Sequence, residues 1–380
     1  MKSGGAAPER GVPSRLLTFE MRFHSFGISQ DPEGSMQATG SRRFTPTSRV
    51  VLTVSILAAL SSGSCSTSDE GGHYHTVADL HVIHADGTGD RVLAAGDSYD
   101  ALLLGDSTFI VHKEITGLCR GSYTGSSIAQ LYSGIPWMDC SISTDRTRVV
   151  LTTNPGAASA NDVYMMNADG TNLIRCGTAA GEYNQARISP ALDEIVFQRL
   201  HAVGTMGPDG GNLRFVDSSS GPVYMLQPLY IDENRILYSV DSTSAKGANG
   251  EVGTTSLVLY DKRNHARTLL VAQSQLFYYG QNMVRGDTLL CSDYGTIKFV
   301  DLRSGLVTTE IPGPGISASF SPDGSKMLYT EGRHVYVRDL RSGSTAMIYT
   351  NADNSRTIAS TEMSPDGRFI VMLVTYSAPG

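Results

Sequence analysis

Short apolar runs separated by polar turns recur from residue 79 to the carboxyl terminus. Clear examples are SASFSPDGSKMLYT at 317–330, STEMSPDGRFIVML at 360–373 and CSISTDRTRVVLTT at 140–153. Each run reads as a strand, a turn built around an aspartate, and a second apolar strand. Proline presets φ and glycine accepts positive φ, so Ser-Pro-Asp-Gly favours a tight turn for a physical reason.

This turn recurs seven times, and one aspartate marks each occurrence. The marks are Asp106, Asp145, Asp193, Asp232, Asp287, Asp323 and Asp366. Their spacing averages about 43 residues, which is the length of a four-stranded propeller blade. A third strand, a glycine turn and a fourth strand follow several marks, as in IKFVDLRSGLVTTEI at 297–311. The sequence predicts an all-β chain with one propeller of seven four-stranded blades over 78–380; six blades is the alternative.

The two ends of this region predict how the ring closes. After Asp366 the chain has room for one more strand, FIVMLV, so the last repeat lacks its third and fourth strands. Residues 79–93, DLHVIHADGTGDRVL, align with the third and fourth strands at 162–176. We therefore expect residues 79–93 to pair with the strands of 357–376, because this pairing protects strands that would otherwise be exposed edges.

The amino-terminal region has the pattern of an export signal. Residues 50–60, VVLTVSILAAL, are uncharged and mostly apolar, and three arginines precede them within residues 42–49. A helix of this length spans about 16 Å, too short for a bilayer core of about 30 Å. A basic segment, a short apolar segment and a small-residue exit indicate a signal peptide over 36–64, with a buried core helix as the alternative.

Cys65 directly follows the small residues, as in a bacterial lipoprotein signal, although Ser62 stands where such signals usually have leucine. We expect a lipid anchor at Cys65, with ordinary cleavage as the alternative. Residues 65–77 then form a flexible tether. Ser66 gives no reason to expect inner-membrane retention. Residues 1–35 do not fit a signal; we expect them to be disordered, with translation starting at Met36 or Met21.

Composition narrows the classes of partner. The chain has 380 residues with 30 basic and 37 acidic side chains, a formal charge of −7. Residues 1–64 hold seven basic and four acidic residues, which leaves 23 basic and 33 acidic residues in the body. An acidic body disfavours phosphate backbones, so nucleic-acid binding is not expected. Forty per cent hydrophobic residues argue against overall disorder.

The repeats resemble TolB-type, WD-repeat-like propellers of bacterial envelope proteins. The resemblance covers about residues 79–380 and is carried by the SPDG turns of repeats six and seven and by NADGTN in repeat two. It implies a propeller in the cell envelope. TolB itself has a further α/β domain before its propeller, for which there is no room between Cys65 and Asp79, and it has six blades.

Motifs for catalysis or metal binding are weak. The chain contains no G-x-S-x-G nucleophile elbow, so serine hydrolysis is not expected. His81 and His84 are three apart on a predicted strand and point to opposite faces, which disfavours a metal site with His73 and His75. We expect no metal and no cofactor. A disulfide between Cys119 and Cys140 is conceivable; the alternative is that these two, Cys176 and Cys291 are buried thiols.

The loops before the inner strands should converge near the axis on one face, the funnel. We assign them to Gly96–Tyr99, Ile135–Asp139, Glu182–Gln185, Leu226–Pro228, Phe277–Asn282 and Arg356–Glu362. Aromatic rings and amides in these loops suit a sugar or a peptide. The predicted ligand-binding residues are Trp137, Asp139, Tyr183, Gln185, Gln227, Tyr278, Tyr279, Gln281, Asn282 and Glu362. The alternative is that the aromatic side chains pack between blades.

Two functions from different classes follow. The preferred interpretation is a monomeric, non-enzymatic binding or scaffold propeller, exported to the periplasm or cell surface and lipid-anchored at Cys65, whose partner is an envelope protein or a glycan. The alternative is a carbohydrate-active propeller enzyme, a polysaccharide lyase or a glycosidase. Asp139 and Glu362 are its candidate carboxylates, since glycoside hydrolysis needs a pair about 5–10 Å apart.

Overall fold

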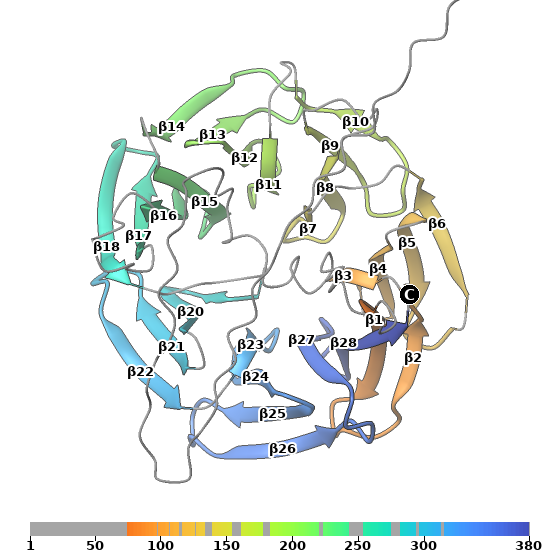
Figure 1. Cartoon of the computed structure of the whole chain (residues 1–380). Helices are drawn as coiled ribbons and strands as arrows, with labels where there is room; N and C mark the ends of the chain where they lie inside the picture. Colours follow the sequence, from red (N-terminus) through yellow and green to blue (C-terminus); the bar gives the residue numbers. More distant parts are fainter. Residues whose placement is uncertain are drawn as a thin grey trace, which may run out of the picture.

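The computed structural model is a ring of seven antiparallel sheets around a central axis, each sheet a four-stranded blade (Figure 1). It describes residues 74–96, 98–105, 107–113, 116–125, 127–133, 139–153, 161–177, 183–219, 223–242, 254–274, 282–293, 296–312 and 315–379. The prediction of seven blades is confirmed, and the six-bladed alternative is wrong. Over these ranges the chain forms no helix, and hence none of a length that could cross a membrane.

The blades follow the chain order from the innermost strand outward. Blades 1 and 2 comprise β3 (Ser98–Leu103), β4 (Thr108–Lys113), β5 (Gly117–Ser122), β6 (Ile128–Tyr132), β7 (Asp139–Ile142), β8 (Arg148–Thr153), β9 (Asp162–Asn167) and β10 (Ile174–Arg175). Blades 3 and 4 comprise β11 (Tyr183–Ile188), β12 (Ile195–Arg199), β13 (Ala202–Met206), β14 (Arg214–Ser218), β15 (Val223–Tyr230), β16 (Arg235–Ser242), β17 (Thr254–Asp261) and β18 (Ala266–Ser274).

The remaining blades continue this order until the ring closes. Blades 5 and 6 comprise β19 (Val284–Arg285), β20 (Thr288–Asp293), β21 (Thr296–Asp301), β22 (Val307–Pro312), β23 (Gly315–Phe320), β24 (Lys326–Glu331), β25 (His334–Asp339) and β26 (Thr345–Thr350). Blade 7 comprises β27 (Thr357–Met363), β28 (Phe369–Pro379), β1 (Tyr74–His84) and β2 (Arg91–Ala94).

The recurring aspartate stabilises the turn between the first two strands of a blade. In blade 6 the buried Ser321 hydroxyl donates to Asp323 at 2.6 Å and accepts the backbone N–H of Lys326 at 2.9 Å. The pairs Ser143–Asp145, Ser189–Asp193 and Ser364–Asp366 repeat this contact in blades 2, 3 and 7. The serine satisfies turn groups that the sheet leaves unpaired, which explains why the motif recurs with the blade.

The hydrophobic core is divided among the spaces between blades. Leu102, Ile110 and Leu118 of blade 1 pack with Val149 and Leu151 of blade 2, and all five are at most 5 % exposed. Similar clusters fill the other spaces around the ring. Because each sheet is covered on both faces by its neighbours, no blade has a core of its own.

Blade 7 joins the two ends of the described chain, as predicted. β1 pairs with β28 along its whole length, from Tyr74 opposite Pro379 to His84 opposite Phe369, and β2 pairs with β1. The first strand begins at Tyr74, four residues before the predicted start of the propeller at residue 78. The residues from Tyr74 to Val77, expected to be tether, are therefore part of the sheet.

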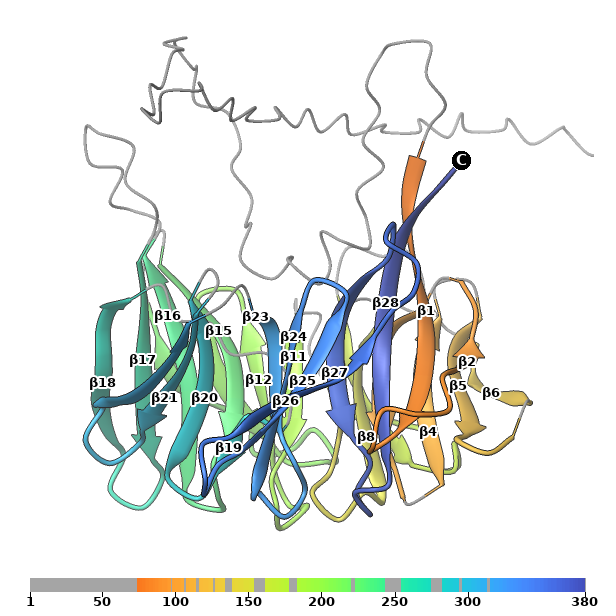
Figure 2. The ribbon, with the colours of Figure 1, turned by 90° about the horizontal axis from the view of Figure 1, so that it is seen from below.

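The ring has two different faces (Figure 2). We call one the turn face; it carries the turns between strands one and two and between strands three and four, such as the turn at Asp323. The other, the loop face, carries the links into each inner strand, such as Ala95–Gly96, and the links between strands two and three, such as Leu200–His201. β1 and β28 project beyond the other strands on the loop face (Figure 2).

Deleting residues 74–94 should abolish folding. This deletion removes β1 and β2, exposes the edge of β28 and uncovers the apolar cluster around Leu80. The expected loss exceeds the ~5–15 kcal/mol that stabilises a typical domain, so the shortened chain should aggregate or unfold. Denaturant midpoints of chains starting at residues 66 and 95 test this; equal midpoints would show that closure is not needed.

Replacing Ser321 by alanine should lower the free energy of unfolding by about 1–2 kcal/mol at neutral pH, because a buried hydroxyl with two partners is lost. Hydrogen bonds to Asp323, the largest from Ser321 and the others from Ser325, lower its pKa to about 2, below its ordinary value of 3.8. This contribution is therefore present above about pH 4 and lost as the pH falls toward 2. Denaturation at pH 7 and pH 2.5 measures it. Ser321→Thr, which keeps the hydroxyl, is the control, and equal losses at both pH values would contradict the assignment.

Candidate functional site

The inner strands are irregular near their middle. The register shifts within β3, β11, β15, β23 and β27, at or close to the same level in each blade. A bulge leaves one residue outside the regular pairing and changes the direction of its side chain. These inner strands are the ones nearest the axis (Figure 1). Their bulges therefore set apart one level of the ring.

The level of the bulges can be identified by counting back from the turn. In six blades the first turn residue donates its backbone N–H across the turn, from Leu104, Ser143, Ser189, Ile231, Ser321 and Ser364. The residue four positions earlier is polar in all six cases. These residues, which we call the axial ring, are Asp100, Asp139, Gln185, Gln227, Ser317 and Ser360. The four whose side chains are described, two glutamines and two serines, are half-buried.

Two neighbouring members of the axial ring are joined directly. The Gln185 side-chain oxygen accepts the backbone N–H of Gln227 at 2.5 Å, which links β11 to β15. Both glutamines have left-handed backbones, with φ of 49° and 56°. Such a conformation costs a residue with a side chain roughly 1–3 kcal/mol and is concentrated at functional positions. Two of the residues predicted to bind the ligand are thus in direct contact.

Asn282 and Glu362 also come together, but nearer the turn face. The Asn282 side-chain amide donates to a carboxylate oxygen of Glu362, and the Asn282 backbone carbonyl accepts the backbone N–H of Phe320 at 2.9 Å. Glu362, in β27, lies two residues before Ser364 and two after the ring residue Ser360. It is therefore closer to the turn face than the axial ring is. Leu226–Pro228, predicted as a loop, is the bulged middle of β15. Position along the strand therefore separates the predicted residues into two levels.

Tyr183 does not face the funnel. Its side chain is fully buried between blades 2 and 3, where the ring packs edge-on against Phe197 with centroids 5.0 Å apart. The Arg199 guanidinium lies over the ring at 5.5 Å. The prediction that Tyr183 offers an exposed aromatic face is wrong, because the apolar ring is worth more in the inter-blade core.

Several predicted residues cannot be placed with the others. Trp137, Tyr278, Tyr279 and Gln281 lie outside the described residues. Asp139 is the first residue of β7 and belongs to the axial ring by its position, but its side chain is also outside the described part.

The histidines and cysteines have structural surroundings. His81 Nδ1 lies 2.9 Å from Asp90, whose other oxygen accepts the Tyr349 hydroxyl at 2.6 Å, so this contact ties blade 7 to blade 6. His84 is exposed and packs on Phe369. In the described part of the chain, no group of three or more metal-binding side chains comes together.

The four cysteines after Cys65 are buried free thiols. Cys119 and Cys140 do not form the disulfide that the sequence left open. Burial raises the pKa of Cys176 to about 12, and it raises that of Cys291 further. A thiol with a raised pKa holds little thiolate at neutral pH, so these cysteines serve as small apolar residues.

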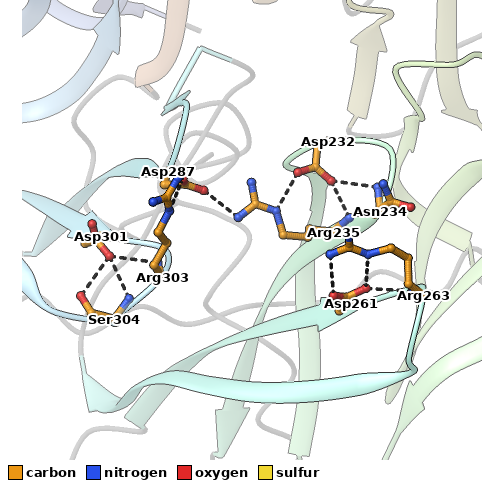
Figure 3. Close-up of polar contacts among 9 residues, drawn as sticks. All are labelled: Asp232, Asn234, Arg235, Asp261, Arg263, Asp287, Asp301, Arg303 and Ser304. Atoms are coloured by element: carbon orange, nitrogen blue, oxygen red, sulfur yellow. Dashed lines mark hydrogen bonds and ion pairs between the residues drawn. The ribbon is translucent and has the colours of Figure 1, made fainter.

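On the turn face between blades 4 and 5, several aspartates pair with arginines (Figure 3). Arg235 pairs with Asp232 in its own blade and with Asp287 in blade 5, both at 2.7 Å, and Arg303 binds Asp287 from the other side. The hydrogen bond from Arg235 is the main reason why the pKa of Asp287 is lowered. This network joins blades 4 and 5, so its aspartates have a structural role.

Asp100, Ser317 and Ser360 were missed by sequence reasoning. A signal was available, because each lies four residues before the first residue of its turn. Aligning the repeats on the turn, rather than assigning loops by length, finds them. The bulges themselves leave no mark in the polarity pattern, which explains why β15 was predicted to begin too late.

Comparison with known proteins identifies the architecture. No protein-family model and no curated protein matches the chain. A chain of the mitotic checkpoint complex matches with a TM-score of 0.52 and 12 % identity, over 79 % of this chain and 94 % of that one. The WD40 domain of Sif2 gives a TM-score of 0.46 and 11 % identity, over 73 % and 94 % of the two chains. A protein described as TolB from Agrobacterium tumefaciens gives 0.43 and 12 %, over 80 % and 99 %. At such identities the likeness shows the propeller fold alone.

Two substitutions separate the roles of the paired glutamines. Gln227→Gly should leave the free energy of unfolding unchanged or raise it by up to about 1 kcal/mol, because glycine adopts positive φ freely. Gln185→Ala should lower it by about 1–2 kcal/mol, because the Gln227 N–H loses an acceptor. Urea denaturation of the two variants measures both effects. Equal destabilisation by the two changes would mean that φ at residue 227 is not strained.

Proposed function

We propose that this protein is an exported propeller, lipid-anchored at Cys65, that binds an envelope protein or a glycan at its axial ring without chemical turnover. The observation that carries the proposal is the ring itself. Six blades place a polar residue at one level of the inner strands, and two neighbouring glutamines adopt strained backbones there. Convergent polar groups at the mouth of a rigid scaffold are characteristic of ligand recognition.

The described side chains of the ring are suited to binding a ligand by hydrogen bonds. The ring members with described side chains carry amides and hydroxyls, which donate and accept hydrogen bonds without titrating near neutral pH. Among the predicted residues, Glu362 is the carboxylate with a described side chain, and it accepts a hydrogen bond from the Asn282 amide.

Export rests on the basic, apolar and small-residue segments that end at Cys65. This signal precedes the propeller closely enough that the folded body would begin within ten residues of the anchor. A scaffold held in this way needs no further domain to stay at the envelope, since a lipid modification supplies the attachment.

The proposal is tested with the full-length chain expressed in a bacterial host. Mass spectrometry of the membrane fraction should find a lipidated amino terminus at Cys65, and Cys65→Ser should move the protein to the soluble fraction. A pull-down and a glycan array with the purified protein should then identify a ligand. An intact terminus upstream of Val50 would overturn export.

The ring is tested by its contribution to affinity. Trp137→Ala, two residues before the ring position Asp139, should weaken binding of that ligand by about 1–3 kcal/mol. Trp137 is the single tryptophan, so its fluorescence should change on binding. Gln227→Gly should also weaken binding while its denaturant midpoint is maintained. Unchanged affinity in both variants would place the ligand elsewhere.

A further inference from the structure

The chain leaves the propeller at a defined point of the loop face. β1 begins at Tyr74, opposite Pro379, and both lie where β1 and β28 project beyond the other strands (Figure 2). From Tyr74 the first strand runs through eleven residues to the turn face. Whatever lies before Tyr74 therefore approaches the propeller from the side on which the inner strands begin.

A buried charged contact holds the base of the projecting strand pair β1–β28. The buried carboxylate of Asp79 accepts the backbone N–H of Gly96 at 2.7 Å and the guanidinium of Arg356 at 2.8 Å. The same guanidinium lies over the ring of Tyr376 in β28, 4.3 Å from its centre. Four segments of the loop face thus meet at one charged contact: β1, the link after β2, the link before β27, and β28. Buried charge pairs of this kind hold their partners in one geometry, so the direction of β1 is set by the body of the protein.

The length of the preceding segment limits where an anchor can lie. Eight residues separate Cys65 from Tyr74, and a fully extended chain of this length spans at most about 30 Å. The eleven residues of β1 cover about 35 Å in the opposite direction. An anchor at Cys65 therefore cannot pass the depth of the blade and reach the level of the turn face.

We infer that the loop face, with the opening of the axial ring, is turned toward the membrane surface that holds the anchor. This inference rests on the anchoring of Cys65 in the proposed function and adds an orientation to it. The surface that the loop face meets is the lipid headgroup layer, at a separation of no more than about 30 Å. A ligand reaching the ring from this side is one carried by that membrane, and the turn face points away from it.

Two reporter positions at opposite ends of one strand test the orientation. Ala191 is exposed in the turn before β12 and Leu200 is half exposed in the link after it, so β12 separates them by roughly 15 Å. Each is replaced by cysteine, Ala191→Cys or Leu200→Cys, and carries a fluorescent label. The native cysteines described in the propeller are buried and remain unlabelled.

The lipidated protein is inserted into vesicles of phosphatidylethanolamine and phosphatidylglycerol that contain a nitroxide-headgroup lipid. The label at position 200 should be quenched at least twofold more strongly than the label at position 191. Inserting thirty Gly/Ser residues after Glu70 should reduce this ratio toward one, because a long flexible tether no longer limits orientation.

The outcomes separate the orientation from the anchoring. Equal quenching at the two positions in vesicle-bound protein with the native tether would overturn the orientation and leave anchoring intact. Stronger quenching at position 191 would reverse it. Failure of the native chain, but not of a control lipoprotein, to associate with vesicles would overturn both the anchor and the orientation. Labelled Cys65→Ser protein, free in solution, supplies the unquenched reference.

Discussion

Pairing between the first and last strands of the propeller is the constraint on which the structure depends. Each blade is covered on both faces by its neighbours, and the clusters between blades form most of the described core. A gap anywhere would expose two apolar sheet faces at once. β1 and β28 prevent this by pairing along eleven residues across the largest sequence separation in the molecule. Closure therefore stabilises blades that contain neither strand, because without it the ring would be open and apolar sheet faces would be exposed.

Polar chemistry is divided between the two faces. On the turn face the recurring serine and aspartate satisfy each other, and arginines pair with Asp232, Asp287 and Glu194; Lys262 also reaches Glu194 in blade 3 at 2.5 Å. These charges are used to hold turns and to join blades. The axial ring differs, because its two glutamines and Ser317 lie where strands leave regular pairing. The inner strands thus carry polar residues at a level separate from the charged network of the turn face.

The two glutamines show how the fold prepares such a position. A regular strand would direct alternate side chains into the spaces on either side of the blade, where the core leaves no room for an amide. The bulge takes one residue out of this alternation. The hydrogen bond from the Gln227 backbone N–H to the Gln185 side chain then stabilises the bulged conformation. β1 begins on the same face of the ring as the inner strands, so the chain enters the propeller on the loop face.

Much of this protein follows from local sequence, and the rest does not. The Ser-Pro-Asp-Gly turns, their period and the incomplete last repeat determined the blade count and the closure, because turn chemistry and strand polarity act over a few residues. Only the tertiary structure decided that Tyr183 packs between blades, since an aromatic residue before a strand fits either a funnel or a core. It alone also separated Asn282 and Glu362 from the glutamine level, because depth along the axis depends on register and bulges. Polarity repeats every two residues and carries no record of a one-residue shift in register.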